Sequence, residues 1–82
     1  MHKRKDIIHN NLKEYRLKAG LTQKEVCKKL GFTNTVALCH WEQGKNIPNL
    51  INVLKLSALF QTSIEALYVL KSEEIKKSLL NS

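Results

Sequence analysis

The segment Leu21–Trp41, LTQKEVCKKLGFTNTVALCHW, decides the fold of this 82-residue chain. Thr22 and Glu25 form a capping box, in which the hydroxyl and the carboxylate satisfy backbone donors at a helix start. Gly31 supplies the permissive backbone that a sharp turn needs. The segment therefore predicts a short helix, a tight turn at Gly31 and Phe32, and a second helix beyond the turn.

The two helices of this segment have inward and outward faces of different character. Apolar spacing predicts inward residues at Val26, Cys27 and Leu30 in the first helix, and at Leu38 and Trp41 in the second. The outward residues of the second helix are Thr35, Val36, Cys39 and His40. Two short helices joined by a tight turn, the second with such an outer face, fit the DNA major groove.

The segments on either side are predicted to be helical as well. A first helix is expected over residues 6–19, with Gly20 ending it. Thr33 or Asn34 is available to cap the third helix, which Gly44 closes. A fourth helix is expected to open at Pro48 and Asn49, with an inward stripe at Leu50, Val53, Leu54, Ser57 and Phe60, widened by Leu56 and Leu59.

The C-terminal part of the chain completes an all-α prediction. Ser63 is expected to cap a fifth helix that runs through Leu70, and Ser72 to start a last one. No strand pattern competes with these assignments. We therefore expect one compact all-α domain of five helices, with the helix-turn-helix formed by helices two and three, plus a short C-terminal helix.

Charge is distributed unevenly along the chain. The formal net charge is +7, and the first 31 residues hold nine basic and three acidic residues, a net charge of +6. Such asymmetry fits binding to nucleic acid, although basic surfaces also bind acidic proteins or membranes.

Composition and spacing argue against several other classes. No apolar run approaches the roughly 18 residues of a membrane span, and no signal-peptide core follows the basic start, so a soluble cytoplasmic protein is expected. The two cysteines and three histidines lack ligand spacing, so neither a metal nor another cofactor is expected. No nucleophile, base and orienting residue fall together, and no phosphate-binding glycine loop occurs, so an enzyme is not expected.

A series of residues resembles the Cro/XRE family of phage-repressor-like helix-turn-helix domains. The matching residues are Arg16, Gly20, Leu21-Thr22-Gln23, Gly31, Trp41-Glu42-Gln43-Gly44 and Pro48, followed by FQTSIEAL at 60–67. The resemblance covers about residues 8–70. It implies that the second helix crosses the phosphate backbone of DNA while the third enters the major groove, the docking that phage repressors exemplify.

The resemblance also implies which residues contact DNA. The base-reading positions fall on Asn34, Thr35, Val36, Cys39 and His40. The backbone-contacting positions fall on Thr22, Gln23, Thr33, Lys45, Asn46 and Asn49. As alternatives, Gln23 is a simple helix-start residue and the 45–49 loop is merely solvated. The segment from Gly31 to Glu42 is one residue longer than the common motif, so the turn or the helix cap must absorb one residue.

Arg16 and Glu42 match a family pair in which an arginine of the first helix meets the glutamate after the third. The resemblance implies a partly buried ion pair with a structural role. Removing one partner of such a pair strands the other charge.

These features predict a transcriptional regulator that binds double-stranded DNA. We expect a repressor that occupies a palindromic operator as a homodimer. The chain then divides into a basic arm at 1–5, a DNA-binding domain at 6–70 and a helical tail at 71–82. The residues expected to dimerise are Leu67, Tyr68, Leu70, Ile75, Leu79 and Leu80.

Three alternatives accompany this prediction. The tail residues pack back onto their own domain instead of dimerising. The basic arm either reaches a neighbouring groove of DNA or stays solvated. The same helical bundle serves as an interaction module, or as an antitoxin, and binds a protein partner.

Overall fold

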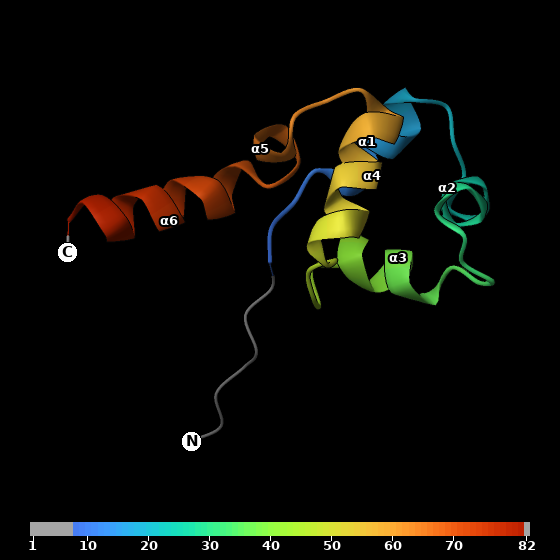
Figure 1. Cartoon of the computed structure of the whole chain (residues 1–82), viewed down its shortest axis with the longest axis horizontal. Helices are drawn as coiled ribbons and strands as arrows, with labels where there is room; N and C mark the ends of the chain where they lie inside the picture. Colours follow the sequence, from blue (N-terminus) through green and yellow to red (C-terminus); the bar gives the residue numbers. More distant parts are fainter. Residues whose placement is uncertain (1–7, 82) are drawn as a thin grey trace, which may run out of the picture.

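The computed structural model describes residues 8–81, which form six helices and no strand (Figure 1). The helices are α1 (Leu12–Lys18), α2 (Gln23–Leu30), α3 (Val36–Glu42), α4 (Leu50–Phe60), α5 (Ile64–Leu67) and α6 (Val69–Leu80). The all-α prediction is confirmed, with α2 and α3 as the helix-turn-helix. The expected basic arm at 1–5 lies outside the described residues.

The first helix begins later than predicted, at Leu12 rather than at residue 6. Asn10 accounts for this difference, because its side chain hydrogen-bonds to backbone groups and so competes with helix formation before Leu12. Its Oδ1 accepts from the Leu12 amide at 3.0 Å, and its Nδ2 donates to the Trp41 carbonyl at 2.9 Å. The segment before α1 is thus tied to the end of α3.

The core lies between α1, α2, α3, α4 and α5. Its buried side chains are Leu12, Val26, Cys27, Leu30, Leu38, Trp41, Leu56, Phe60, Leu67 and Tyr68. Phe32 packs edge-on against Trp41, with 5.8 Å between the ring centroids. The inward faces predicted for α2 and α3 are therefore confirmed.

The prediction of which residues of the fourth helix face inward is wrong in part. The structure buries Val53, Leu56 and Phe60, whereas Leu50 and Leu54 are 68% and 47% exposed. Apolar residues occur on nearly every side of this helix, so spacing alone allows two neighbouring stripes. Packing against the rest of the core selects one of them.

Gln61 ends α4 in a left-handed conformation, with φ of 53° and ψ of 49°. The Thr62 amide donates to the Ser57 carbonyl at 3.0 Å, so the freed carbonyls at the helix end are satisfied. The helix ends sharply even though Gln61 is not a glycine.

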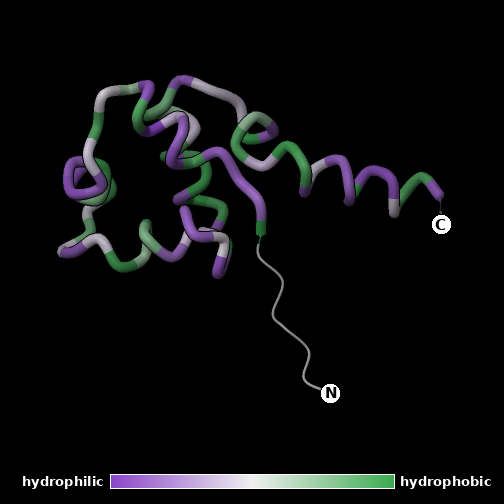
Figure 2. The backbone as a smooth tube through the Cα atoms, turned by 180° about the vertical axis from the view of Figure 1, so that it is seen from behind, coloured by the Kyte–Doolittle hydropathy of each residue, from purple (hydrophilic) through white to green (hydrophobic). Residues whose placement is uncertain are grey.

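The fifth and last helices meet earlier than predicted. The chain leaves α5 after Leu67, and Tyr68, with φ of −130° and ψ of 50°, separates it from α6. The last helix begins at Val69 rather than at Ser72. It has no buried residue, and Figure 1 shows it extending from the body of the molecule. Figure 2 shows hydrophobic and hydrophilic residues alternating along it.

Candidate nucleic-acid interface

The start of α2 is fixed by the predicted capping box. The Thr22 hydroxyl accepts from the Glu25 amide at 3.0 Å, and the Glu25 carboxylate accepts from the Thr22 amide at 2.8 Å. The hydrogen bond from the Thr22 amide holds the pKa of Glu25 below its ordinary value, and the Thr22 hydroxyl makes a smaller contribution in the same direction. Gln23 is thereby held as the first residue of the helix.

The turn between α2 and α3 is built on Gly31, whose φ of +88° is the left-handed conformation that glycine adopts without strain. The Phe32 amide donates back to the Cys27 carbonyl at 2.8 Å, which closes the end of α2. The chain then stays non-helical until Val36. The extra residue between Gly31 and Glu42 is therefore absorbed before α3 begins.

The two residues predicted to cap α3, Thr33 and Asn34, both lie before its N-cap position, so that prediction is wrong. Asn34 Oδ1 accepts from the Val36 amide at 3.0 Å. Thr35 stands at the N-cap position and makes no capping bond with its side chain. This geometry places Val36, rather than Asn34 or Thr35, at the first position of the helix.

A network centred on Glu42 joins α1, α2 and the end of α3. Arg16 donates to the Glu42 carboxylate through Nε at 2.6 Å and through Nη2 at 3.3 Å, and it donates to the Leu21 carbonyl through Nη1 at 2.9 Å. Gln23 Nε2 donates to Glu42 Oε1 at 3.0 Å. Both charged side chains are buried, with 8% and 5% exposed. The network therefore sets the position of α3 relative to α2.

The outer face of α3 carries the predicted base-reading residues. Thr35, Val36, Cys39 and His40 lie at positions i, i+1, i+4 and i+5, a spacing that places them on one side of a helix. None of them is buried, and Val36 is 55% exposed. Cys39 Sγ accepts from Gln43 Nε2 at 3.4 Å. Asn34 and Thr33 are exposed in the turn beside this face.

The predicted backbone contacts occupy two places. Thr22 and Gln23 line a shallow surface hollow together with Thr35, so the start of α2 adjoins the start of α3. Lys45 and Asn46 are exposed in the loop after α3. Asn49 caps α4, because its Oδ1 accepts from the Asn52 amide at 2.9 Å. In the Asn49 side chain, only Nδ2 remains to donate to a ligand.

The residues predicted to dimerise divide into two groups. Leu67 and Tyr68 are 0% and 8% exposed and belong to the monomer core, so they offer no surface to a second chain. The other four are exposed on α6: Leu70, Ile75, Leu79 and Leu80. The C-terminal helix alone thus carries the predicted contact surface.

Sequence reasoning missed the residues that position α1. Besides Asn10, Asn11 donates through its amide to the Leu67 carbonyl at 2.8 Å and through Nδ2 to the Ala66 carbonyl at 2.9 Å. Two asparagines directly before the first residue of an apolar-periodic segment are a helix-start signal that would have found them.

Within residues 8–81, no three histidine, cysteine or acidic side chains lie close enough to hold a metal ion. Among the described helices, none is long and apolar enough to cross a membrane.

Two short helices at a tight turn, with the second exposing a row of contact-forming side chains, define a helix-turn-helix DNA-binding protein. The helix-turn-helix family profile matches residues 12–67. The chain therefore belongs to the Cro/XRE-type helix-turn-helix regulators and is a DNA-binding transcriptional regulator.

Three relatives illustrate this membership. An uncharacterized HTH-type transcriptional regulator of Archaeoglobus fulgidus is 32% identical over 68 residues, which are 83% of this chain and 96% of that protein. One of Methanocaldococcus jannaschii is 34% identical over 67 residues, 82% of this chain and 100% of that protein. HTH-type transcriptional regulator ImmR of Bacillus subtilis is 41% identical over 70 residues, 85% of this chain and 53% of that protein. No solved structure gives a significant match.

Proposed function

We propose that α3 reads base sequence in the major groove and that the protein represses transcription by occupying a palindromic operator as a homodimer. The observation that carries the proposal is the Glu42 network. Its bonds hold α2 and α3 in one fixed arrangement while the outer face of α3 stays exposed. A preorganised reading helix loses little conformational freedom when it binds.

The exposed side chains of α3 suit base contacts. The Val36 side chain and the Thr35 methyl group are suited to the methyl group of thymine. His40 and the amide nitrogen of Asn34 are donors for base edges or phosphates. Asn34, Thr35 and Val36 lie at or beside the N-terminus of α3, the part of a recognition helix that contacts bases, and His40 lies in its last turn on the same outer face.

Contacts with the DNA backbone are proposed for both flanks of the reading helix. The Gln23 amide nitrogen carries two N–H groups, so one is available for a phosphate while the other braces Glu42. Thr22 lies beside Gln23, Thr33 is exposed in the turn before α3, and Lys45, Asn46 and Asn49 follow α3. Such contacts fix the register of a protein on DNA without reading its sequence.

Dimerisation is proposed through α6. A single domain makes few base contacts, and a symmetric pair doubles them over half-sites about 34 Å apart. The 12 residues of α6 contain no buried residue, and isolated helices of about 12–15 residues are marginal in water. Burying its apolar residues against a second chain would stabilise it: Leu70, Ile75, Leu79 and Leu80.

Repression by occupancy of a promoter would require no reaction. A protein that covers a promoter blocks its use, and no catalytic step is required of any residue named above. We propose that the protein acts by DNA binding alone.

Selection of bound sites from random duplex DNA tests the proposal. A palindromic consensus, with half-sites one helical turn apart, is the expected result. The control is a Leu50→Ala/Ile51→Ala/Leu54→Ala variant on the exposed face of α4, which should select the same consensus. Salt-sensitive binding with no consensus would reduce the interaction to nonspecific electrostatics and refute sequence reading. Loss of DNA binding with retained capture of a protein partner would favour the interaction module.

A further inference from the structure

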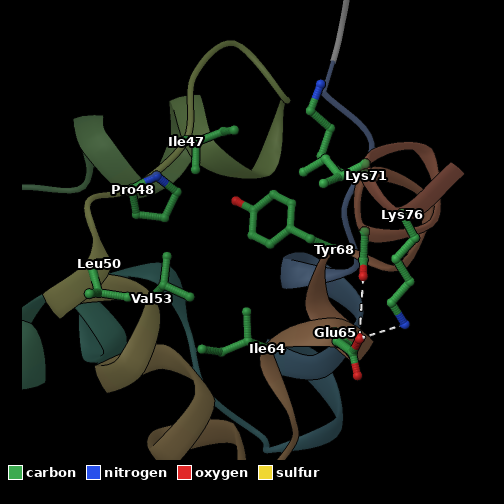
Figure 3. A pocket seen from close by; sticks show the side chains of 11 residues that line it. Ile47, Pro48, Leu50, Val53, Ile64, Glu65, Tyr68, Lys71 and Lys76 are labelled. Carbon is green, nitrogen blue, oxygen red and sulfur yellow. Dashed lines mark hydrogen bonds and ion pairs between the residues drawn. The ribbon is translucent and has the colours of Figure 1, made fainter. Parts of the chain in front are cut away.

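An apolar groove lies on the molecule between the loop after α3, the start of α4 and the segment from α5 into α6 (Figure 3). Its volume is about 560 Å³. The apolar lining residues are Ile47, Pro48, Leu50, Val53, Ile64 and Ile75. None of the residues proposed to contact DNA lines this groove.

The Tyr68 hydroxyl is the feature that distinguishes this groove from a merely apolar surface. The residue is only 8% exposed, and none of the groups in residues 8–81 makes a hydrogen bond with its hydroxyl oxygen, which is also closed to water. Figure 3 shows the ring in the groove with the hydroxyl directed toward Ile47 and Pro48. A buried hydroxyl without a partner is a rare and unfavourable arrangement in folded proteins.

The protonation state of this hydroxyl indicates which kind of hydrogen-bond partner it lacks. Burial raises the pKa of Tyr68 to about 12, so the phenol keeps its proton at neutral pH. It therefore has an O–H donor to offer and lacks an acceptor.

We propose that this groove binds a small neutral molecule with an apolar body and one carbonyl group, which accepts a hydrogen bond from Tyr68. Its volume lies within the roughly 300–1,000 Å³ of small-molecule sites, and such sites combine apolar walls with a few polar groups. The Ile47 side chain is 47% exposed, so its displacement gives the carbonyl a path to the hydroxyl.

The charges beside the groove favour a neutral ligand. Glu65 and Lys76 are paired at 3.1 Å, and Lys71 lies 4.0 Å from Glu74. Within residues 8–81, no charged neighbour affects the Tyr68 hydroxyl, since burial alone raises its pKa, and an ionised ligand group placed there would lose its hydration without a counter-charge.

A second copy of this chain is the competing occupant. Its α6 offers exposed aliphatic side chains such as Leu70 and Ile75. Side chains of this kind would fill apolar volume but leave the Tyr68 hydroxyl without an acceptor. The groove therefore matches a carbonyl compound better than it matches this helix.

The test compares two probes of matched shape on the full chain by two-dimensional NMR. The first probe, 4-phenylbutan-2-one, has an apolar body and one carbonyl, and the second, butylbenzene, lacks the carbonyl. The ketone should bind about ten-fold more tightly than the hydrocarbon, as one buried hydrogen bond predicts, with resonance shifts at Val53, Ile64 and Ile75. Tyr68→Phe should abolish the preference while the fold persists, and Tyr15→Phe, a substitution in α1, should preserve it.

Three outcomes would overturn the proposal. The first is equal affinity of the wild type and Tyr68→Phe for the ketone. The second is no saturable shift of groove resonances with either probe. The third is displacement of the Val53 and Ile64 resonances by protein concentration alone, which would assign the groove to a second copy; Ile75 is left out of this comparison because it belongs to the proposed α6 contact. The measurement requires no DNA, so it stands apart from the proposed operator binding.

Discussion

Substitution of Glu42 by alanine tests the network that positions the reading helix. The change removes an acceptor of three hydrogen bonds and leaves the Arg16 guanidinium, whose side chain is 8% exposed, with only the Leu21 carbonyl. Breaking one side of a buried ion pair costs about 3–5 kcal/mol, because the remaining charge is desolvated without a partner. A domain of this size is stable by about 4–12 kcal/mol, so Glu42→Ala should remove a large part of that free energy.

The assay is urea unfolding, followed by Trp41 fluorescence and by circular dichroism at 25 °C. Glu14→Ala is the matched control, since Glu14 meets Lys18 at 3.4 Å in an exposed pair that contributes at most about 0.5 kcal/mol. Replacing both partners, as Arg16→Met/Glu42→Leu, should recover much of the loss because no charge is then stranded. A free energy of unfolding for Glu42→Ala within about 0.5 kcal/mol of the wild-type value is no larger a difference than the error of such assays. That result would refute the reasoning.

Two further predictions concern helix ends. Because the lowered pKa of Glu25 lies below that of the unfolded chain, its stabilising contribution is present above the ordinary carboxyl range and is lost as the pH falls through the lowered value. Glu25→Gln should therefore flatten the loss of stability on acidification, measured by thermal unfolding between about pH 6 and pH 2, and an unchanged slope would contradict the capping box. Gln61→Gly should raise stability by about 0.5–1 kcal/mol, since glycine adopts the left-handed conformation without strain. Gln61→Ala is the control and should give no gain, and a destabilised Gln61→Gly would show that this backbone is not strained.

Features decided within a few residues were predictable from the sequence. The Thr22–Glu25 capping box, the Gly31 turn and the inward faces of α2 and α3 all depend on local spacing and on one permissive residue. The predicted contact between Arg16 and Glu42 is long-range, and it was available only because the resemblance supplied both partners.

Features decided by tertiary packing were not predictable in the same way. Which stripe of α4 is buried depends on the neighbouring helices, because its Leu-rich sequence supports two. The break between the last two helices falls at Tyr68, whose ring is buried in the core, whereas the sequence predicted that the fifth helix would run through Leu70 and the last would start at Ser72. The same burial removed Leu67 and Tyr68 from the predicted dimer surface.

The most direct test of the central claim is the operator affinity of a variant with all four outward α3 residues changed to alanine: Thr35, Val36, Cys39 and His40. The substitutions lie outside the core, so the circular dichroism spectrum should match that of the wild type. Lost base contacts of about 1–3 kcal/mol each should lower specific affinity by about a thousand-fold, toward nonspecific binding. An unchanged operator affinity in the folded variant would contradict the assignment of α3 as the reading helix.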